Sequence, residues 1–588
     1  MKKSPRKLIS TKKLVILGID GMDPNILDKG FREGLFPNLK QIANNGFYST
    51  LSTTTPPQSP VAWASFATGQ DPSVHGIFDF IRRDPVDYGL NLSFFLDSVK
   101  KRTSKVDPFW IDFSKEKIRT VSLFLPDLFG LPKKMCGKMI LGMGVPDILG
   151  TQGRYTFFTT KIYSKSNLLR RGIVVNINKS KIIKTYIEGE EYQDRGKKKT
   201  VRIPIEFKIL GDIVEIKIQK SLIKLKVGEF SEWVNLEFRI DFLNVKRGIA
   251  KFYIKSVAPD LEVYLSPINL DPISPSMAIS YPENFSKELS LKLGNFSTLG
   301  FPHDTWALEE GVLDEKAFLI QANSIILERE KIYYSELESQ KEGLLFAYFG
   351  MLDTISHMFW RFRNSNRSYR STINEYYERV DKIVGQTLSR LDNNTGFVIL
   401  SDHGFGSFDF EFNINSWLEN QGYLTLKNKS GGILYENVDW SKTKVYAGGY
   451  NSVFFNIRGR EVNGVLGKNE AISLQKEIIT KLANYKNPKT NKRIIKHIYT
   501  REEMGVDDGD LYAPDLIVGF YKNTRSSWDS AVGAVTNYVL RERKSKWNGD
   551  HLFDPSEVPG VIFVNKNISF VSPSIKDIIR LSKKYFLS

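Results

Sequence analysis

Leu14-Val15-Ile16-Leu17-Gly18-Ile19-Asp20 is the strongest structural signal in the chain, an unbroken apolar run that ends in an acid. A continuous apolar run bounded by polar residues is typical of a parallel strand that is buried on both faces. The acid follows the strand at its carboxyl end, which is where open α/β sheets bind their ligands. We therefore expect an α/β fold whose functional groups follow its strands.

The sequence on either side of this run alternates between helix and strand signals. Asp23-Pro24 predicts the start of a helix, because proline is favoured in the first helical turn. Further helices are predicted over 37–43, 60–68, 313–338 and 372–391, and further strands over 46–53, 344–349, 397–400, 445–457, 515–521 and 560–564.

The middle of the chain has a different pattern. Thr200–Ile209 and Val214–Ile218 alternate between apolar and polar residues, as do other short segments between about 154 and 270, which favours an antiparallel β sandwich. Helices and buried strands return afterwards. We expect one α/β domain with a mixed sheet flanked by helices, formed by 1–153 and 276–588, and a β-rich insertion over 154–275.

Composition limits the class of protein. The chain has 588 residues, of which 41% are hydrophobic and 25% charged, so wholesale disorder and collagen-like repeats are excluded. A single cysteine, Cys136, excludes an internal disulfide scaffold and a cysteine-rich zinc site. The apolar run after the basic segment Met1–Lys13 is too short for a signal peptide, and no run of about 18–20 apolar residues predicts a membrane span. These features predict a cytoplasmic enzyme or binding protein.

The chain is basic, with 83 Lys and Arg against 66 Asp and Glu and a formal net charge of +17. Such an excess attracts anions, whereas dispersed surface charge serves solubility alone. Lys197–Lys199 is the only obvious basic run, and the acidic pair Glu190-Glu191 lies close to it. We expect no specific nucleic-acid site.

Three predicted strands are followed by acids: Asp20, Asp353 and Asp402. At one edge of a sheet, three carboxylates would repel one another unless protons or metal ions neutralised them. Any one of them alone could instead be a helix N-cap.

Histidines lie beside the same strands. His357 is four residues after Asp353, so a helix would place both side chains on one face, and His403 adjoins Asp402. His551 precedes the strand predicted at 560–564. A lone histidine is usually structural, but this combination of imidazoles and carboxylates favours divalent metal ions.

Ser59 is a candidate nucleophile. It precedes Pro60 where a helix is predicted to begin, and a helix N-terminus favours an alkoxide and an incoming phosphate. The alternative is a plain N-cap serine.

Together these motifs resemble the alkaline phosphatase superfamily, in particular its type I phosphodiesterase/nucleotide pyrophosphatase-like branch and, within it, the predicted phosphohydrolase/phosphomutase group. The resemblance covers both halves of the α/β core but not the insertion. It rests on Gly18-Ile-Asp-Gly-Met-Asp23, Pro56-Pro-Gln-Ser-Pro-Val-Ala-Trp-Ala-Ser-Phe-Ala-Thr-Gly69, His75-Gly-Ile-Phe-Asp-Phe80, Asp353 with His357-Met-Phe-Trp360, Ser401-Asp-His-Gly-Phe-Gly406 and Gly549-Asp-His551.

The resemblance implies a phosphoric ester hydrolase of the phosphatase/phosphodiesterase type, with two divalent metal ions and a small-molecule phosphate ester as substrate. Zinc suits the mixed nitrogen and oxygen ligands, and manganese is the alternative. One ion would be held by Asp353, His357 and His551, and the other by Asp20, Asp402 and His403 with the oxygen of Ser59. Ser59 would be the nucleophile that becomes a phosphoserine intermediate.

The resemblance also has a point of departure. Phosphodiesterases of the family are expected to carry an asparagine three residues after the nucleophile to bind a phosphate oxygen, and this chain has Ala62 there. The departure argues against a preference for diesters. Arg361 and Arg363 are candidates for binding the phosphate dianion, although they also fit an ordinary helix surface. Specificity is expected from the insertion and from the loop Phe405–Trp417, which carries Asn413 and Asn415.

Three other functions compete with a phosphoric ester hydrolase: a sulfatase, a phosphomutase and an anion-binding protein. A sulfatase needs Pro two residues and Arg four residues after its nucleophile, and Ser59-Pro-Val-Ala-Trp63 lacks both. A phosphomutase using the same site, and a non-catalytic anion-binding protein, stay open. The sequence names neither the physiological substrate nor the oligomeric state.

Overall fold

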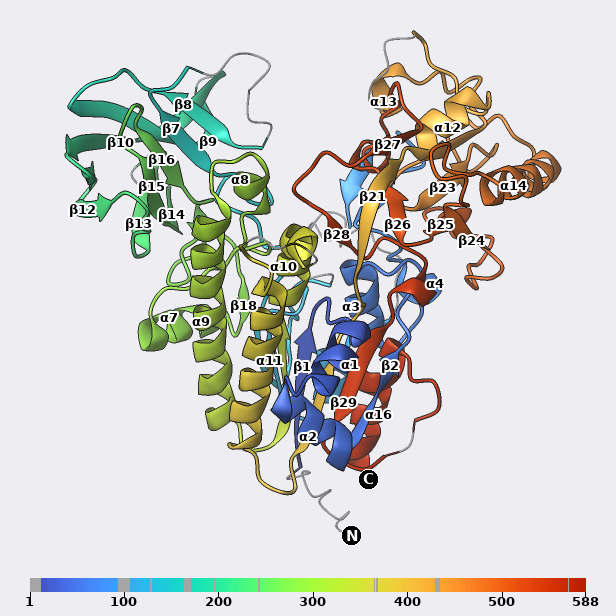
Figure 1. Cartoon of the computed structure of the whole chain (residues 1–588), viewed down its shortest axis with the longest axis horizontal. Coiled ribbons are helices and arrows are strands. Elements are labelled where there is room, and N and C mark those ends of the chain that lie inside the picture. The colour runs from blue at the N-terminus through green and yellow to red at the C-terminus, as the bar shows by residue number, and fades with distance from the viewer. Residues whose placement is uncertain are drawn as a thin grey trace, which may run out of the picture.

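The computed structural model describes most of the chain (Figure 1). The described residues are 12–93, 106–126, 129–162, 171–194, 196–241, 244–363, 365, 368–428, 434–568 and 570–588. The basic N-terminal segment singled out in the sequence therefore lies almost entirely outside them.

The centre of the molecule is an eight-stranded mixed sheet. Its order is β18 (Ser280–Tyr281), β6 (Gly137–Ile140), β5 (Thr120–Leu123), β19 (Gly343–Phe349), β1 (Lys13–Ile19), β20 (Gly396–Leu400), β29 (Gly560–Val564) and β2 (Phe47–Leu51). The central strand β1 is parallel to both of its neighbours, β19 and β20, whereas β29, β2 and β18 run antiparallel to their partners. The mixed sheet expected from the sequence is confirmed.

The apolar run of β1 is continuous because both faces of the sheet are covered. Val15, Leu17 and Ile19 belong to the hydrophobic core on one face, and Leu14 and Ile16 belong to the core on the other. The first core is closed by α1 (Pro24–Arg32), α2 (Pro37–Asn45), α9 (Glu315–Ser339), α10 (Met351–Phe359) and α11 (Thr372–Leu388). The second core is closed by α3 (Ser59–Thr68), α6 (Phe109–Lys115) and α16 (Ile575–Leu587).

The β-rich segment forms a lobe of its own beyond one end of this sheet (Figure 1). It contains three small sheets, ordered β12-β11-β10-β9, β13-β14-β17 and β15-β16-β7-β8. Pairing is antiparallel, as the alternation predicted, except between β7 and β8. The strands are β7 (Thr156–Thr159), β8 (Ile173–Asn176), β9 (Ile182–Asp194), β10 (Lys197–Leu210), β11 (Ile213–Ile218), β12 (Ser221–Lys226), β13 (Val234–Arg239), β14 (Val245–Ala250), β15 (Phe252–Ser256), β16 (Glu262–Leu265) and β17 (Asn269–Leu270).

A second lobe follows β20 and was not predicted as a separate unit. It holds the sheets β26-β21-β27, with β28 on β21, and β22-β23-β25-β24, and the helices α12 (Ile414–Asn420) and α14 (Lys468–Ala483). Its strands are β21 (Gly406–Phe412), β22 (Val445–Ala447), β23 (Ser452–Phe455), β24 (Ile495–Thr500), β25 (Leu516–Phe520), β26 (Asn523–Ser526), β27 (Leu540–Glu542) and β28 (Gly549–Asp550).

The prediction of one strand over 445–457 was wrong. The chain turns back between β22 and β23, which pair antiparallel. Gly449 has a φ of 88°, in the left-handed region that glycine adopts readily, and this lets the chain reverse direction.

Acidic residues pair with lysines around the basic run that the sequence contains. In the basic run, Lys198 pairs with Glu191 at 3.4 Å, and Glu190 pairs with Lys246, so the acidic pair partly neutralises its surroundings. Cys136 is exposed and free. Among the helices of the described residues, none is both long enough and apolar enough to cross a membrane.

Candidate active site

Three aspartates meet at one edge of the sheet because three adjacent parallel strands end there. Ile19 is in register with Phe349, and Gly18 with Leu400, so the chain leaves β1, β19 and β20 at the same level. Asp20 follows β1, Asp402 follows β20, and Asp353 lies in the first turn of α10, just past β19. Gly350 is the N-cap of α10 and Asp23 that of α1, so the N-cap reading fails for Asp353 and Asp20.

Gly21 allows two of these segments to come together. Its φ is 72°, and a Cβ built on it would lie 2.8 Å from the Cα of Asp353. Its backbone N–H donates to Oδ1 of Asp402 at 3.3 Å. A larger residue would therefore be strained and would also push the Asp353 backbone away.

Ser59 lies against the same carboxylates. It is the first residue of α3, it is 4% exposed, and Gln58 is the N-cap, so Ser59 is not the capping residue. Its Oγ lies 3.2 Å from Nε2 of His403 and 3.5 Å from Oδ1 of Asp20. The hydroxyl that the sequence singled out is thus buried among candidate ligands at a helix N-terminus.

Three buried histidines present the same ring nitrogen to this site. Nε2 of His357 lies 3.2 Å from Asp353, Nε2 of His403 lies 3.3 Å from Asp402, and Nε2 of His551 lies 3.7 Å from Asp353. Each Nδ1 faces a backbone carbonyl: Gly549 at 2.7 Å, Gly404 at 3.1 Å and Pro57 at 2.7 Å, respectively. A carbonyl can only accept, so Nδ1 of each ring carries a proton, and in a neutral ring Nε2 then keeps a free lone pair. Burial opposes a charge on His357, but the charge of Asp353 and its hydrogen bond raise the pKa of this histidine.

The orientation of Asp20 is also fixed. The indole N–H of Trp63 and the hydroxyl of Tyr348 both donate to Oδ2, at 3.0 and 2.7 Å. This leaves Oδ1 directed toward Ser59 and His403. Such supporting hydrogen bonds orient ligands in metal sites.

A buried ion pair supports the loop that carries His551. Arg525 and Asp550 are each at most 1% exposed, and Nη1 of Arg525 donates to Oδ2 of Asp550 at 2.8 Å. The other carboxylate oxygen accepts the backbone N–H of His551 at 2.7 Å. Burial alone would raise the pKa of Asp550, but the charge of Arg525 and the neighbouring imidazoles lower it to about 2.

The electrostatics of the site favour bound cations. Burial, and then the charge of Asp353, raise the pKa of Asp20 to about 7, and burial with the charges of Asp20 and Asp353 raises the pKa of Asp402 well above its usual range. Burial lowers the pKa of His403 and of His551, so both imidazoles are neutral at neutral pH. Neutral imidazoles at His403 and His551 cannot compensate the buried acids Asp20 and Asp402, whereas bound cations can.

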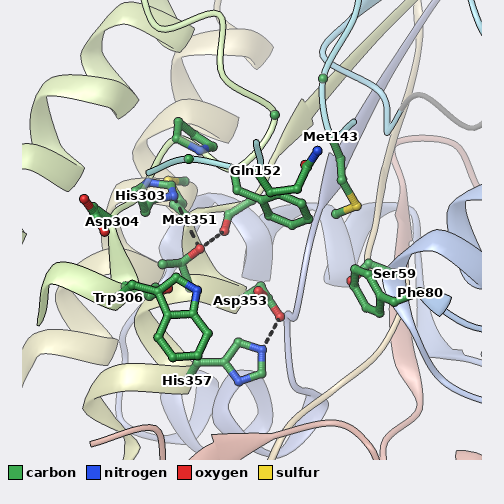
Figure 2. A pocket seen from close by; sticks show the side chains of 18 of the residues that line it. Ser59, Phe80, Met143, Gln152, His303, Asp304, Trp306, Met351, Asp353 and His357 are labelled. Atoms are coloured by element: carbon green, nitrogen blue, oxygen red, sulfur yellow. Dashed lines mark hydrogen bonds and ion pairs between the residues drawn. The ribbon is translucent and has the colours of Figure 1, made fainter. Parts of the chain in front are cut away.

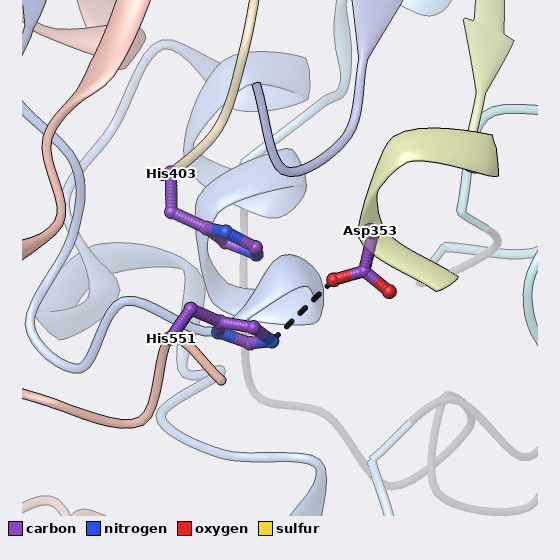
Figure 3. A group of neighbouring side chains, drawn as sticks. All are labelled: Asp353, His403 and His551. Atoms are coloured by element: carbon purple, nitrogen blue, oxygen red, sulfur yellow. Dashed lines mark ion pairs between the residues drawn. The ribbon is translucent and has the colours of Figure 1, made fainter. Parts of the chain in front are cut away.

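The donor atoms fit divalent metal ions. Two groups have ligand atoms within 4.8 Å of one another, Asp353 with His403 and His551 (Figure 3), and Asp20 with Asp402 and His403. His403 belongs to both groups, and His357 contacts Asp353 beside the first. Within the described ranges of the chain, Oδ1 of Asp353 and Oδ2 of Asp402 are buried and have no hydrogen-bond partner; a bound cation would supply one.

A cavity of about 390 Å³ opens onto these residues. Ser59, Asp353, His357 and His551 form part of its wall, and the rest of the wall is mainly apolar (Figure 2). The carboxylates of Asp20 and Asp402 lie behind this surface, so the cavity presents the serine hydroxyl to a ligand.

Three subsidiary expectations differ from the structure. Ala62 is fully buried in a hydrophobic core and does not line the cavity. Arg361 pairs with Glu315 at 2.7 Å, and Arg363 lies over the Trp360 ring; neither lines the cavity.

The loop at Phe405–Trp417 does not line the cavity either. Asn413 caps α12, and Asn415 exchanges hydrogen bonds with the backbone of Ala447, so both asparagines hold the second lobe together.

Comparison with known families identifies the chain. Residues 14–136 and 264–509 match the sequence profile of type I phosphodiesterase / nucleotide pyrophosphatase. The chain belongs to this family. The resemblance drawn from the motifs is confirmed, and the family makes the chain a phosphoric ester hydrolase. The unmatched stretch between the two segments contains most of the β-rich lobe.

Solved structures with a similar arrangement are distant. Phosphonoacetate hydrolase from Sinorhizobium meliloti 1021, in complex with phosphonoacetate, is 12% identical with a TM-score of 0.49, covering 98% of this chain and 96% of its own. Human ectonucleotide pyrophosphatase / phosphodiesterase 5 is 10% identical with a TM-score of 0.42, covering 98% and 95%. Similarity at this level says nothing about the substrate of this chain. No curated protein sequence matches it.

Proposed function

We propose that this member of the family is a metal-dependent phosphohydrolase that cleaves a small phosphate ester through a phosphoserine at Ser59. The observation that carries the proposal is the position of the Ser59 hydroxyl. It is buried at a helix N-terminus, within 3.5 Å of Asp20 and His403, and on the wall of the cavity.

Two divalent ions are the proposed cofactors, zinc in the first instance with manganese as the alternative. Asp20, Asp402 and His403 would hold one ion with the Ser59 oxygen, and Asp353, His357 and His551 would hold the other. Bound there, the ions would supply Lewis acidity and positive charge for phosphoryl transfer. With two ions, three aspartates and a serine alkoxide, the formal charges cancel before substrate arrives.

The proposed reaction has two steps, and both take place at the oxygen of Ser59. Ser59 Oγ loses its proton to solvent and attacks phosphorus, the bond from phosphorus to the ester oxygen breaks, and the alcohol leaves with that electron pair and takes up a proton. Water then cleaves the Oγ–phosphorus bond, releases phosphate and restores the hydroxyl. The N-terminus of α3 favours the negative charge that develops at Oγ.

The remaining contacts keep the ligands in place. The carbonyls of Pro57, Gly404 and Gly549 fix the histidine tautomers, and Trp63 and Tyr348 aim Asp20. An arrangement set before substrate binds does not have to reorganise during the reaction. A phosphomutase would use the same first step and return the phosphoryl group to another hydroxyl.

The test combines metal analysis with the nucleophile variant. We expect the purified protein to hold up to two equivalents of zinc or manganese and to hydrolyse nitrophenyl phosphates. Ser59→Ala should lower turnover by at least about a thousandfold. Quenched wild-type reactions should yield phosphoserine at position 59 by mass spectrometry. Unchanged turnover in Ser59→Ala, or full activity after chelation of the metal ions, would refute the proposal. Transfer of the phosphoryl group to an added alcohol without release of phosphate would indicate a phosphomutase.

A further inference from the structure

The cavity is built partly by the two connections between the α/β core and the β-rich lobe. Gln152 and Gly153 lie on the segment that enters the lobe, and Phe301, His303 and Trp306 lie on the segment that follows it. In Figure 2, Gln152 and His303 lie above Asp353 and His357, and Ser59 lies to one side of all four. The wall therefore extends well beyond the atoms that would handle the phosphate.

Polar atoms on this wall lack hydrogen-bond partners. Both amide atoms of Gln152, Nε2 of His303 and Nη1 of Arg329 are buried and find no hydrogen-bond partner among the described residues, and all three residues line the same cavity. Unpartnered buried polar groups are uncommon in folded proteins, and a cluster of them along one cavity indicates a ligand that supplies the missing partners.

The environment of Arg329 indicates that this ligand is negatively charged. Its guanidinium stacks on the Phe124 ring at 3.3 Å and donates to the carbonyl of Ser297 at 3.3 Å, and in the described part of the chain no carboxylate pairs with it. The neighbouring Glu328 is bound by Lys251 and by the backbone N–H of Ser297. Burial lowers the pKa of Arg329 to about 9, so it remains a cation at neutral pH.

Arg525 provides a contrast on the same wall. It is fully buried but is neutralised by Asp550 and Glu411. Arg329 is a buried guanidinium without such a carboxylate among the described residues, and a carboxylate or phosphoryl group of a ligand matches its geometry. Arg171, the third arginine of the wall, is exposed and lies over the Trp306 ring. Elsewhere on the same wall, side chains such as Phe80, Met143, Phe301 and Trp306 offer apolar contacts.

We propose that Gln152 and Arg329 bind a second anionic group of the substrate. The substrate class is then a phosphate ester whose alcohol part has an apolar body and ends in an acidic group. This inference rests on the proposed function, because it assumes that the phosphate lies at Ser59.

A matched pair of substrates tests it. Para-carboxyphenyl phosphate and para-carbamoylphenyl phosphate have nearly the same size and differ in the charge at the far end. With metal-reconstituted protein, we expect kcat/KM to be at least about tenfold higher for the carboxylate, since a charge-assisted hydrogen bond to Arg329 is gained. Arg329→Gln should bring the ratio close to one. Arg390→Gln, an arginine on the far side of the core that pairs with Glu338, should leave it unchanged.

Binding gives a second readout, measured by calorimetry on Ser59→Ala protein. The carboxylate should bind more tightly than the amide, and Arg329→Gln should abolish the difference. If Arg329→Gln does not fold, Arg329→Lys and Gln152→Leu replace it, with a reduced ratio expected for each.

The outcomes separate the two proposals. Equal kcat/KM for the two esters, with hydrolysis that depends on Ser59, would overturn the second anion site and leave the hydrolase intact. If neither ester is hydrolysed, the proposed function fails, but the calorimetric comparison still tests the anion site. Equal binding of the two esters would then overturn the anion site. Tighter binding of the carboxylate that depends on Arg329 would support it.

Discussion

The imidazole rings of His403 and His551 stack face to face, with centroids 3.7 Å apart and planes inclined by 13°. Each Nδ1 faces a different backbone carbonyl, and Figure 3 shows both rings beside Asp353. Two protonated imidazoles would repel each other at this distance, and the pKa of each is lowered. Burial lowers the pKa of both imidazoles, and the charge of His551 lowers that of His403 further. Both rings are therefore neutral, which is the state that binds a metal ion.

The stack can be kept while the ligand is removed. His551→Phe retains an aromatic ring against His403 but has no nitrogen at the Nε2 position. We expect a loss of about one equivalent of bound metal and at least a hundredfold loss of turnover, with a native circular dichroism spectrum. His497→Phe, at a half-exposed histidine paired with Glu503, is the control and should retain both metal and activity. Full metal content in His551→Phe would remove this residue from the proposed ligands.

The hydrogen bond from Tyr348 to Asp20 should affect metal affinity more than folding. Tyr348→Phe removes the donor at 2.7 Å and leaves the ring in place. We expect metal affinity to fall about tenfold to a hundredfold, as for other residues that orient ligands, measured by competition with a chelator. Tyr333→Phe removes a comparable buried hydrogen bond, to Thr387, away from the site. Equal effects of the two variants on metal affinity would contradict an orienting role for Tyr348.

Alanine variants of Gly21 and Gly34 separate the effect of backbone strain on stability from the effect of displacing the Asp353 backbone on the site. Both have positive φ, 72° and 78°, but a Cβ would contact Asp353 only at Gly21, and it would meet nothing within 4 Å at Gly34. Each alanine variant should lose about 1–2 kcal/mol to strain. Gly21→Ala should in addition lose metal and at least tenfold in turnover, whereas Gly34→Ala should retain both when assayed well below its melting temperature.

Acid should destabilise the protein partly through His303. Burial, and then the charge of Arg329, lower its folded-state pKa from 6.5 to about 4. The unfolded state therefore binds more protons between these values, so the stabilising contribution of neutral His303 is present above pH 6.5 and is lost as the pH falls toward 4. His303→Gln should reduce the loss of stability between neutral pH and pH 4 by about 2 kcal/mol. Chemical denaturation at several pH values measures this, and an unchanged pH dependence would show that His303 is protonated at no cost.

Much of the sheet and of the candidate site could be predicted from local sequence. Asp20, Asp353 and Asp402 could be placed together because each follows a strand buried on both faces, and buried parallel strands end at one edge of a sheet. The histidines followed from their spacing to these acids. The role of His551 was harder to predict, since His551 lies in the loop after β28 and only its motif indicated a role.

The supporting contacts could not be predicted in this way. Trp63 and Tyr348 reach Asp20 from α3 and β19, and an isolated aromatic residue does not indicate which carboxylate it will meet. The carbonyls that fix the histidine tautomers are backbone atoms and leave no sequence signal. Arg329 looked like an ordinary residue of a long helix, because its lack of a carboxylate partner is a property of the packed structure.

The order of strands has a consequence for how the polypeptide matures. The strand β1 precedes the β-rich lobe in the chain, yet its two partners, β19 and β20, are synthesised only after the whole lobe. In the same way, β2 must wait for β29, which follows the second lobe. Asp20 and Ser59 therefore acquire the rest of their surroundings late in synthesis. A nascent chain that stops before residue 560 lacks β29, so β2 has no partner strand and the apolar strand β20 is left as an unpaired edge. Such a fragment is a target for chaperones and proteases rather than a partly active enzyme.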